Sequence, residues 1–179
     1  SLASVVMTVV VIVVARKTDT VSAAGARKMS HIGIGVVFVV TWLFFPDEPR
    51  SGVVASLLPF GVAAVIAVTQ LFPSNVLGQL LTSTMSRSGD VKELFQGPLI
   101  YALVIGTLTA VFWRTTPIGV VAVIVLCVGD GTAEVFGVRG RHVVPSPFGR
   151  KTVEGVVAFV VCSLLAALGF EWLFFGRVW

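Results

Sequence analysis

Charge is scarce in this sequence. Asp, Glu, Lys and Arg make up 12% of its 179 residues, whereas hydrophobic residues make up 56%. An average soluble domain carries about 25% charged residues. A soluble chain of this length could not bury so much apolar surface, because burial is limited by the ratio of surface to volume. The composition therefore excludes an ordinary soluble domain and predicts that lipid surrounds most of the chain.

Cysteine is also rare. Cys127 and Cys162 lie in apolar runs without the spacing of metal-ligand pairs, and we expect both to be small buried hydrophobic residues.

The net charge of +4 does not indicate a nucleic-acid partner. Its basic residues flank apolar segments, as membrane anchors do, so membrane lipid is the expected surrounding partner.

Six long runs with little charge are candidates for membrane-spanning helices: Leu2–Ala15, Ile32–Phe45, Val53–Phe72, Leu99–Trp113, Ile118–Val128 and Val153–Phe175. A spanning helix needs about 20 apolar residues, so we expect the short second and fifth helices to extend into adjoining polar residues. Backbone groups in lipid must be satisfied internally, and the runs lack the alternation of barrel strands. The sequence therefore predicts an all-α fold, a single polytopic transmembrane bundle of about six helices over residues 1–179. The first run begins at Leu2 without a clear cleavable signal, so a short upstream segment is expected.

Ten of the 13 basic residues lie in three of the connections: Arg16, Lys17, Arg27 and Lys28 in the first, Arg87 and Lys92 in the third, and Arg139, Arg141, Arg150 and Lys151 in the fifth. We expect the fifth loop to run from Gly129 to Thr152. Loops one, three and five of a six-helix bundle share one side, which the positive-inside rule makes cytoplasmic. The prediction is an integral protein of a prokaryotic cytoplasmic membrane, with a polar site formed by the cytoplasmic loops.

Acidic residues gather on the same side: Asp90, Glu93, Asp130, Glu134 and Glu154. Membrane anchoring alone explains the basic residues but not these acids. Ionisable groups beside apolar helices are costly and indicate a functional site by default. The charge pattern therefore favours an enzyme at the membrane boundary.

The segment from Val128 to Gly140 carries the clearest chemical pattern. Asp130 and Glu134 are four residues apart, so on a helix their carboxylates face the same way. Several glycines accompany them: Gly129, Gly131, Gly137 and Gly140. Glycine allows a ligand to approach the backbone closely, and Mg²⁺ prefers one or two carboxylates together with phosphate oxygens. The alternative interpretation is a helix cap followed by packing glycines.

A second pattern, Gly149 to Gly155, precedes the last apolar run. Lys151 and Glu154 are three apart and would share a helical face. A lysine at a helix N-terminus is unfavourable unless an anion binds there. The segment is not a Walker A motif, because it lacks the upstream glycine. His142, between the two patterns, is expected at the loop surface.

Two further segments carry candidate residues. Arg27 and His31 are one turn apart at the start of the second run, where His31 could be a general base, a phosphate ligand or an interfacial residue. In the third loop, the guanidinium of Arg87 can bind phosphate as a fork.

Four motifs occur in order along the chain: Arg27-Lys-x-x-His31, Ser86-Arg-x-Gly-Asp90 with Glu93 and Gly97-Pro98, Gly129-Asp-Gly-x-Ala-Glu134 with Gly137 and Gly140, and Lys151-x-x-Glu-Gly155. Their combination resembles the phytol, farnesol and dolichol kinase family, which is related to phosphatidate cytidylyltransferases. The resemblance implies transfer of phosphate from CTP, with Mg²⁺, to a long isoprenoid alcohol. Glu134 departs from the pattern, since Asp is common there, and the stretch from Val143 to Phe148 is unfamiliar. Both departures leave the identity of the alcohol open.

The resemblance also implies roles for single residues. Asp130, Glu134 and Asp90 would hold Mg²⁺, and His31 or an acid would accept the hydroxyl proton. The remaining assignments are Lys151 and Glu154 as catalytic, and Arg27, Lys28, Arg87, Lys151, Gly129, Gly131, Gly137, Gly140 and Gly155 as nucleotide-binding.

Three alternatives remain beside the kinase. A cytidylyltransferase would make a CDP-lipid, and a diacylglycerol kinase would use a different alcohol. A small transporter would carry charges at the centres of several helices. A homo-oligomer is possible.

Overall fold

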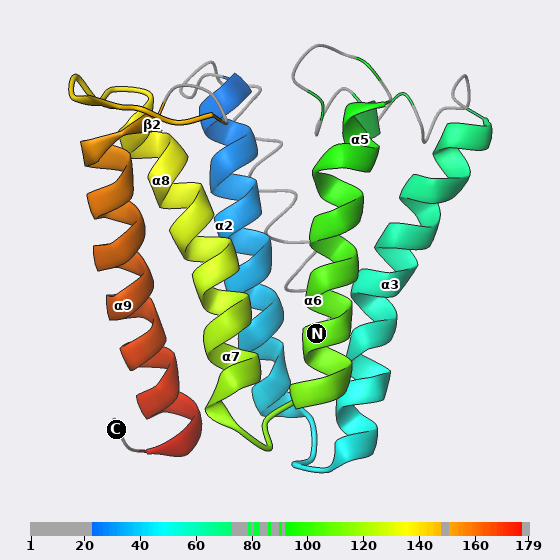
Figure 1. Cartoon of the computed structure of the whole chain (residues 1–179). Helices are drawn as coiled ribbons and strands as arrows, with labels where there is room; N and C mark the ends of the chain where they lie inside the picture. Colours follow the sequence, from blue (N-terminus) through cyan, green and yellow to red (C-terminus); the bar gives the residue numbers. More distant parts are fainter. Residues whose placement is uncertain are drawn as a thin grey trace. The chain divides into compact units, whose positions relative to one another are not determined.

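The computed structural model describes residues 23–72, 79, 81–82, 86, 90, 92–147 and 151–176, and these form two compact units (Figure 1). Unit 1 contains the described residues up to Phe45 and those from Thr116 onwards, and unit 2 contains those within Pro46–Thr115. The first apolar run, Leu2–Ala15, lies outside the described residues. The expectation of a single domain over the whole chain stays a prediction.

Unit 1 consists of three helical rods and a small hairpin. Its elements are α2 (Ala23–Thr41), the 3-10 turn η1 (Trp42–Phe44), α7 (Pro117–Ile124), the π-helical segment η2 (Val125–Gly129), α8 (Asp130–Gly137), β1 (Val143–Val144), β2 (Lys151–Thr152) and α9 (Val153–Phe175). The segments α7, η2 and α8 follow one another as a single rod (Figure 1). The two strands pair antiparallel, with Val143 opposite Thr152.

The elements of unit 2 include α3 (Pro49–Leu71), α5 (Glu93–Gln96) and α6 (Pro98–Phe112). Proline stands in the first turn of α3, α6 and α7, where its missing N–H costs nothing. Helix α9 begins at the cap Thr152 and ends at Gly176, whose φ of 65° suits glycine. These local signals explain why α3, α6, α7 and α9 begin within a few residues of the predicted apolar runs.

The described residues include four helices that are long and apolar enough to cross a membrane: Pro49–Thr69, Glu93–Phe112, Pro117–Gly137 and Val153–Phe175. Ile32–Phe44 is a shorter apolar helix. The all-α membrane bundle is therefore confirmed. The polar extensions of the second and fifth predicted helices are confirmed too, since α2 begins at Ala23 and the rod of α7, η2 and α8 continues to Gly137.

One predicted boundary is wrong. The fifth loop was expected from Gly129, but the chain stays helical to Gly137, and β1 and β2 then form a hairpin. Apolar periodicity ends near Val128, but Gly129 and Gly131 fit between neighbouring helices, so the helix continues past the apolar run.

The core of unit 1 includes residues of α2 and of the α7 rod. Val39, Val120 and Cys127 are fully buried there, which confirms the prediction for Cys127, while Cys162 is only half-buried. Trp42 packs edge-on against Phe38 and Phe174, with ring centroids 5.9 and 6.4 Å apart. Aromatic packing thus joins the end of α2 to the end of α9.

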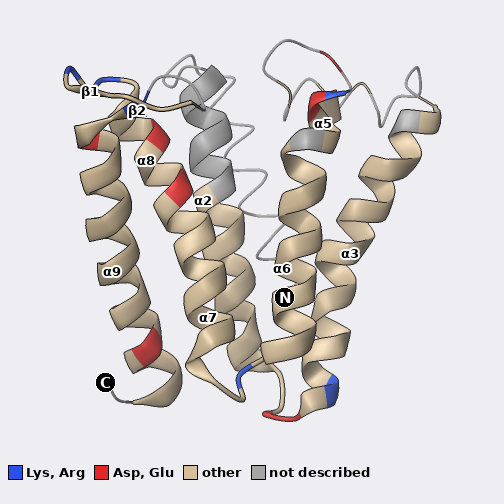
Figure 2. Cartoon of the chain, in the orientation of Figure 1, with Lys and Arg blue, Asp and Glu red and all other residues tan. Residues whose placement is uncertain are grey.

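Within unit 1, charged residues gather around α8, the hairpin and the start of α9 (Figure 2). Among the charged side chains that the structure describes in this unit, the exception is Glu171, which is buried near the far end of α9. It lies 17 residues beyond Glu154, about 25 Å along the helix at 1.5 Å per residue. One end of unit 1 is therefore polar, and the candidate site is at that end.

Candidate active site

Two carboxylates of α8 lie at the polar end of unit 1. Asp130 is exposed and Glu134 is half-buried, and as fourth neighbours they lie on one face of the helix. The π-helical segment η2 immediately precedes Asp130. The hydroxyl of Thr132 donates to the carbonyl oxygens of Val128 and Gly129, at 2.7 and 3.1 Å, which helps to satisfy the backbone at this irregular turn. Such π segments are frequent at functional sites.

The glycines beside Asp130 pack against neighbouring helices. A Cβ on Gly129 would overlap Ser163 and Phe159 of α9, and a Cβ on Gly131 would overlap Ile32 of α2. Small residues at such crossings allow helix backbones to approach closely. The packing interpretation of these two glycines therefore has direct support, and their nucleotide-binding roles stay predictions.

Helices α8 and α9 meet through a second pair of glycines. A Cβ on Gly155 would lie 2.8 Å from the carbonyl oxygen of Ala133 and 3.0 Å from the Cα of Gly137. Both are backbone atoms, so no side chain could move aside. This contact fixes the start of α9 against the carboxylate-bearing helix.

Thr152 reinforces the same junction from a buried position. Its hydroxyl donates to the carbonyl oxygen of Gly137 at 3.1 Å and accepts from the N–H of Gly155 at 3.3 Å. It therefore caps α9 and at the same time satisfies the end of α8.

Replacing Thr152 with Val should destabilise the protein by about 1 kcal/mol or more, because the cap and the bond to Gly137 are both lost. Thermal unfolding of the purified protein in detergent measures the effect. Thr152→Ser keeps the hydroxyl and should unfold near the wild-type temperature. Equal melting of the Val and wild-type proteins would show that the cap is not used.

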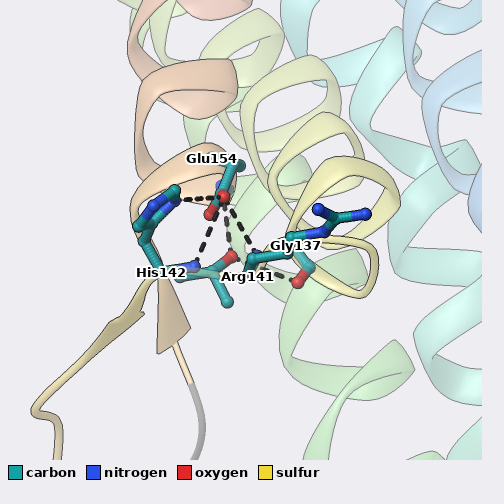
Figure 3. A network of polar contacts seen from close by, with 6 residues as sticks. Gly137, Arg141, His142 and Glu154 are labelled. Carbon is teal, nitrogen blue, oxygen red and sulfur yellow. Dashed lines mark hydrogen bonds and ion pairs between the residues drawn. The ribbon is translucent and has the colours of Figure 1, made fainter.

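Glu154 holds the chain between α8 and the hairpin (Figure 3). Its Oε1 accepts from the backbone N–H of Arg141 at 3.0 Å and of His142 at 3.3 Å. The same oxygen lies 2.8 Å from Nδ1 of His142. Its Oε2 is buried without a hydrogen-bond donor among the described residues. Glu154, predicted as catalytic, thus positions a loop and a histidine.

Gly140 leaves room for this carboxylate. A Cβ on Gly140 would lie 2.6 Å from Oε2 of Glu154 and 2.5 Å from Oγ1 of Thr152. The glycine therefore supports the loop geometry, and its predicted contact with nucleotide stays a prediction.

Lys151 lies in β2, not on α9, so the prediction that Lys151 and Glu154 share a helical face is wrong. In the strand, Lys151 pairs with Val144 of β1. Lys151 remains an exposed cation beside the start of α9, and its catalytic role stays a prediction.

Asp90 belongs to unit 2, where its carboxylate accepts from the N–H of Lys92 at 2.8 Å just before α5. The hydroxyl of Ser86 donates to Glu93 at 2.8 Å nearby. Asp90 thus stabilises a turn in this structure. Its place beside Asp130 and Glu134 in one metal site stays a prediction.

Some predicted residues fall outside what the structure describes. Arg87 lies outside the described residues. Arg27, Lys28 and His31 lie on the backbone of α2, but their side chains are not described. Their predicted roles stay predictions.

Sequence reasoning missed the pairing of His142 with Glu154. The histidine is exposed, as expected, with 79% of its side chain accessible, but its ring is bound to the carboxylate. A hairpin signal was available, because Val143 and Val144 are separated from Lys151 and Thr152 by a short segment that contains Pro145 and Pro147.

Taken together, the described residues define an α-helical membrane protein whose carboxylates, cation and histidine gather at one end of unit 1. Among them, no group of three or more His, Cys, Asp or Glu side chains is placed to hold a metal ion by itself.

Comparison with known proteins gives the family. The chain is 36% identical over 146 residues to a protein of rice (Oryza sativa subsp. japonica) named probable phytol kinase 2, chloroplastic, covering 80% of this chain and 47% of that protein. It is 32% identical over 155 residues to the Arabidopsis thaliana farnesol kinase, chloroplastic, covering 85% and 50%. Phytol kinase 1, chloroplastic, of Arabidopsis thaliana is 31% identical over 123 residues, covering 68% and 39%. No protein-family model matches the chain. No solved structure matches it either.

By these alignments the chain belongs to the phytol and farnesol kinase family, as its four motifs indicated. It spans about half the length of the curated relatives it matches. These relatives are plant chloroplast proteins by name, which conflicts with the expected prokaryotic cytoplasmic membrane.

Proposed function

We propose that this chain transfers the γ-phosphoryl group of CTP to the hydroxyl of a long-chain isoprenoid alcohol at the membrane boundary. The similarity to proteins named phytol kinase and farnesol kinase over about 80% of the chain carries the proposal. The polar end of unit 1 supports it, because a lipid hydroxyl and a soluble nucleotide can meet only at such a boundary.

The residues of α8 suit a nucleotide bound with Mg²⁺. Asp130 and Glu134 offer hard oxygen ligands one turn apart, and Mg²⁺ commonly takes one or two carboxylates and completes its shell with phosphate oxygens and water. Bound Mg²⁺ would neutralise charge on the triphosphate. In phosphoryl transfer, positioning and charge stabilisation supply most of the catalysis.

The basic residues would hold the phosphates. Lys151 lies exposed beside the start of α9, where its ammonium group can reach an anion at this end of the unit. Arg27, Lys28 and Arg87 would add charge from the first and third connections. The names of the relatives favour a kinase over the cytidylyltransferase and transporter alternatives.

The experiment is a matrix of donors and acceptors. Purified chain in lipid nanodiscs is incubated with Mg²⁺ and each of CTP, ATP, GTP and UTP, against phytol, geranylgeraniol, farnesol, dolichol and diacylglycerol. The proposal expects an alcohol monophosphate, made fastest from CTP and an isoprenoid alcohol. Absence of every isoprenoid phosphate would refute it, and a product made only from diacylglycerol would replace it.

A further inference from the structure

An open groove of about 440 Å³ runs along α9 in unit 1. Its walls are apolar: Phe136 of α8, with Val153, Val157, Ala158, Val161 and Cys162 of α9. Val153, Val157 and Val161 are successive fourth neighbours, so the groove follows one face of the helix for about 12 Å. His142 and Glu154 also line it, near the start of α9. The groove thus combines a long apolar wall with a polar pair.

The polar pair has a defined hydrogen-bond direction. A carboxylate can only accept, so Nδ1 of His142, 2.8 Å from Oε1 of Glu154, carries the proton in this contact. With Nδ1 as the donor, Nε2 is the ring nitrogen that can accept a proton, and it lies on the side of the ring away from the carboxylate. The carboxylate of Glu154 is held in place, since its Oε1 also accepts two backbone N–H groups and its Oε2 is buried beside Gly140. This is the arrangement of a histidine base held by a carboxylate.

We propose that the groove binds the acceptor alcohol, with its apolar chain along α9 and its hydroxyl at His142, and that His142 is the general base. This inference rests on the proposed function. The occupant must be apolar along its length and carry a hydrogen-bond donor at one end, which a lipid alcohol does. Plain hydrocarbon would leave the pair unused, and an anionic headgroup would meet the charge of Glu154. The same repulsion would favour release of the phosphorylated product.

In the proposed step, the alcohol oxygen forms a bond to the γ-phosphorus of a nucleoside triphosphate as the bond from that phosphorus to the β,γ-bridging oxygen breaks. The hydroxyl proton passes to Nε2 of His142, and the nucleoside diphosphate leaves. Solvent then takes the proton from the exposed ring. His142 therefore replaces His31 as the proposed proton acceptor, with Glu154 as its positioning residue.

Binding of the alcohol in the groove is tested without turnover, by the rate at which the thiol of Cys162 is alkylated. This half-buried thiol lines the groove, whereas Cys127 is fully buried, so in a Cys127→Ser background N-ethylmaleimide reports on the groove alone. Geranylgeraniol without nucleotide should slow alkylation of Cys162 severalfold, and hexadecane should not. Equal rates with and without the alcohol, or equal protection by hexadecane, would overturn the groove assignment. Protection in a wild-type protein that phosphorylates no alcohol would refute the proposed function and the base, and would leave the groove as a lipid-alcohol site.

Groove shape is tested by a matched pair on α9. Val161 lines the groove, whereas its neighbour Val160 is 55% exposed and does not. Val161→Trp should lower kcat/KM for geranylgeraniol about tenfold or more and abolish Cys162 protection. Val160→Trp should change neither value. Equal behaviour of the two variants would overturn the proposal.

The base is tested by His142→Asn, whose side-chain amide can still donate to Glu154 but has no nitrogen that accepts a proton. We expect kcat to fall about 10²–10⁴-fold, with KM for the nucleotide and Cys162 protection unchanged. Arg141→Gln is the control, because only its backbone N–H binds Glu154. Wild-type kcat in His142→Asn would remove His142 as the base.

Discussion

Asp130→Asn should lower phosphoryl transfer by about a hundred- to a thousandfold, the usual cost of removing one group that stabilises charge in a transition state. Asp130 is exposed at the first residue of α8, so the change keeps the size of the side chain and removes one negative charge. We expect Mg²⁺-dependent CTP binding to weaken as well. Turnover and nucleotide binding of the purified protein measure the two effects.

Asp47→Asn is the matched control for this prediction. Asp47 is also exposed, in the connection before α3 of unit 2, so Asp47→Asn makes the same change in net charge without altering α8. It should retain wild-type activity. If Asp130→Asn kept more than half of the activity while both variants melted normally, Asp130 would not hold the metal or the phosphates.

Gly155→Ala should destabilise the protein by about 1–3 kcal/mol, the usual cost of forcing an extra group into a packed interior. The new Cβ would meet the carbonyl oxygen of Ala133 and the Cα of Gly137, so α8 and α9 would have to separate. We expect a lower thermal unfolding temperature. Activity should also fall, since the helices that carry Asp130 and Glu154 are held together at this point.

Gly169→Ala is the control on the same helix. A Cβ on Gly169 would have no heavy atom within 4 Å, and Ala is about 0.5–1 kcal/mol better than Gly in a helix interior. The control should therefore unfold at or above the wild-type temperature. A Gly155→Ala protein as stable as Gly169→Ala would contradict the packing role of Gly155 and return it to the predicted nucleotide-binding set.

The apolar helices could be predicted from the sequence because hydrophobic length is a strong signal. The prediction Val153–Phe175 matches α9 residue for residue. The end of the fifth helix could not be placed in this way, because Gly129 and Gly131 are poor helix formers alone. They are helical here because their missing side chains admit α9 and α2, which is tertiary information.

In the candidate site, too, local features could be predicted from the sequence and tertiary contacts could not. Asp130 and Glu134 were found from their spacing, which local geometry sets. The contact of His142 with Glu154 joins residues 12 apart and depends on the hairpin between them. The burial of Glu171 could not be predicted for a related reason, since one acid near the end of an apolar run gives no sign that its side chain is buried.

The position of the label in the lipid product tests the central claim most directly. Purified chain is given farnesol or geranylgeraniol with CTP labelled at either the γ- or the α-phosphorus, and the lipid product is extracted. The account predicts label in the lipid from γ-labelled CTP only, with CDP released. Label from α-labelled CTP, with pyrophosphate released, would make the chain a cytidylyltransferase, and an unlabelled lipid fraction from both would contradict phosphoryl transfer from CTP.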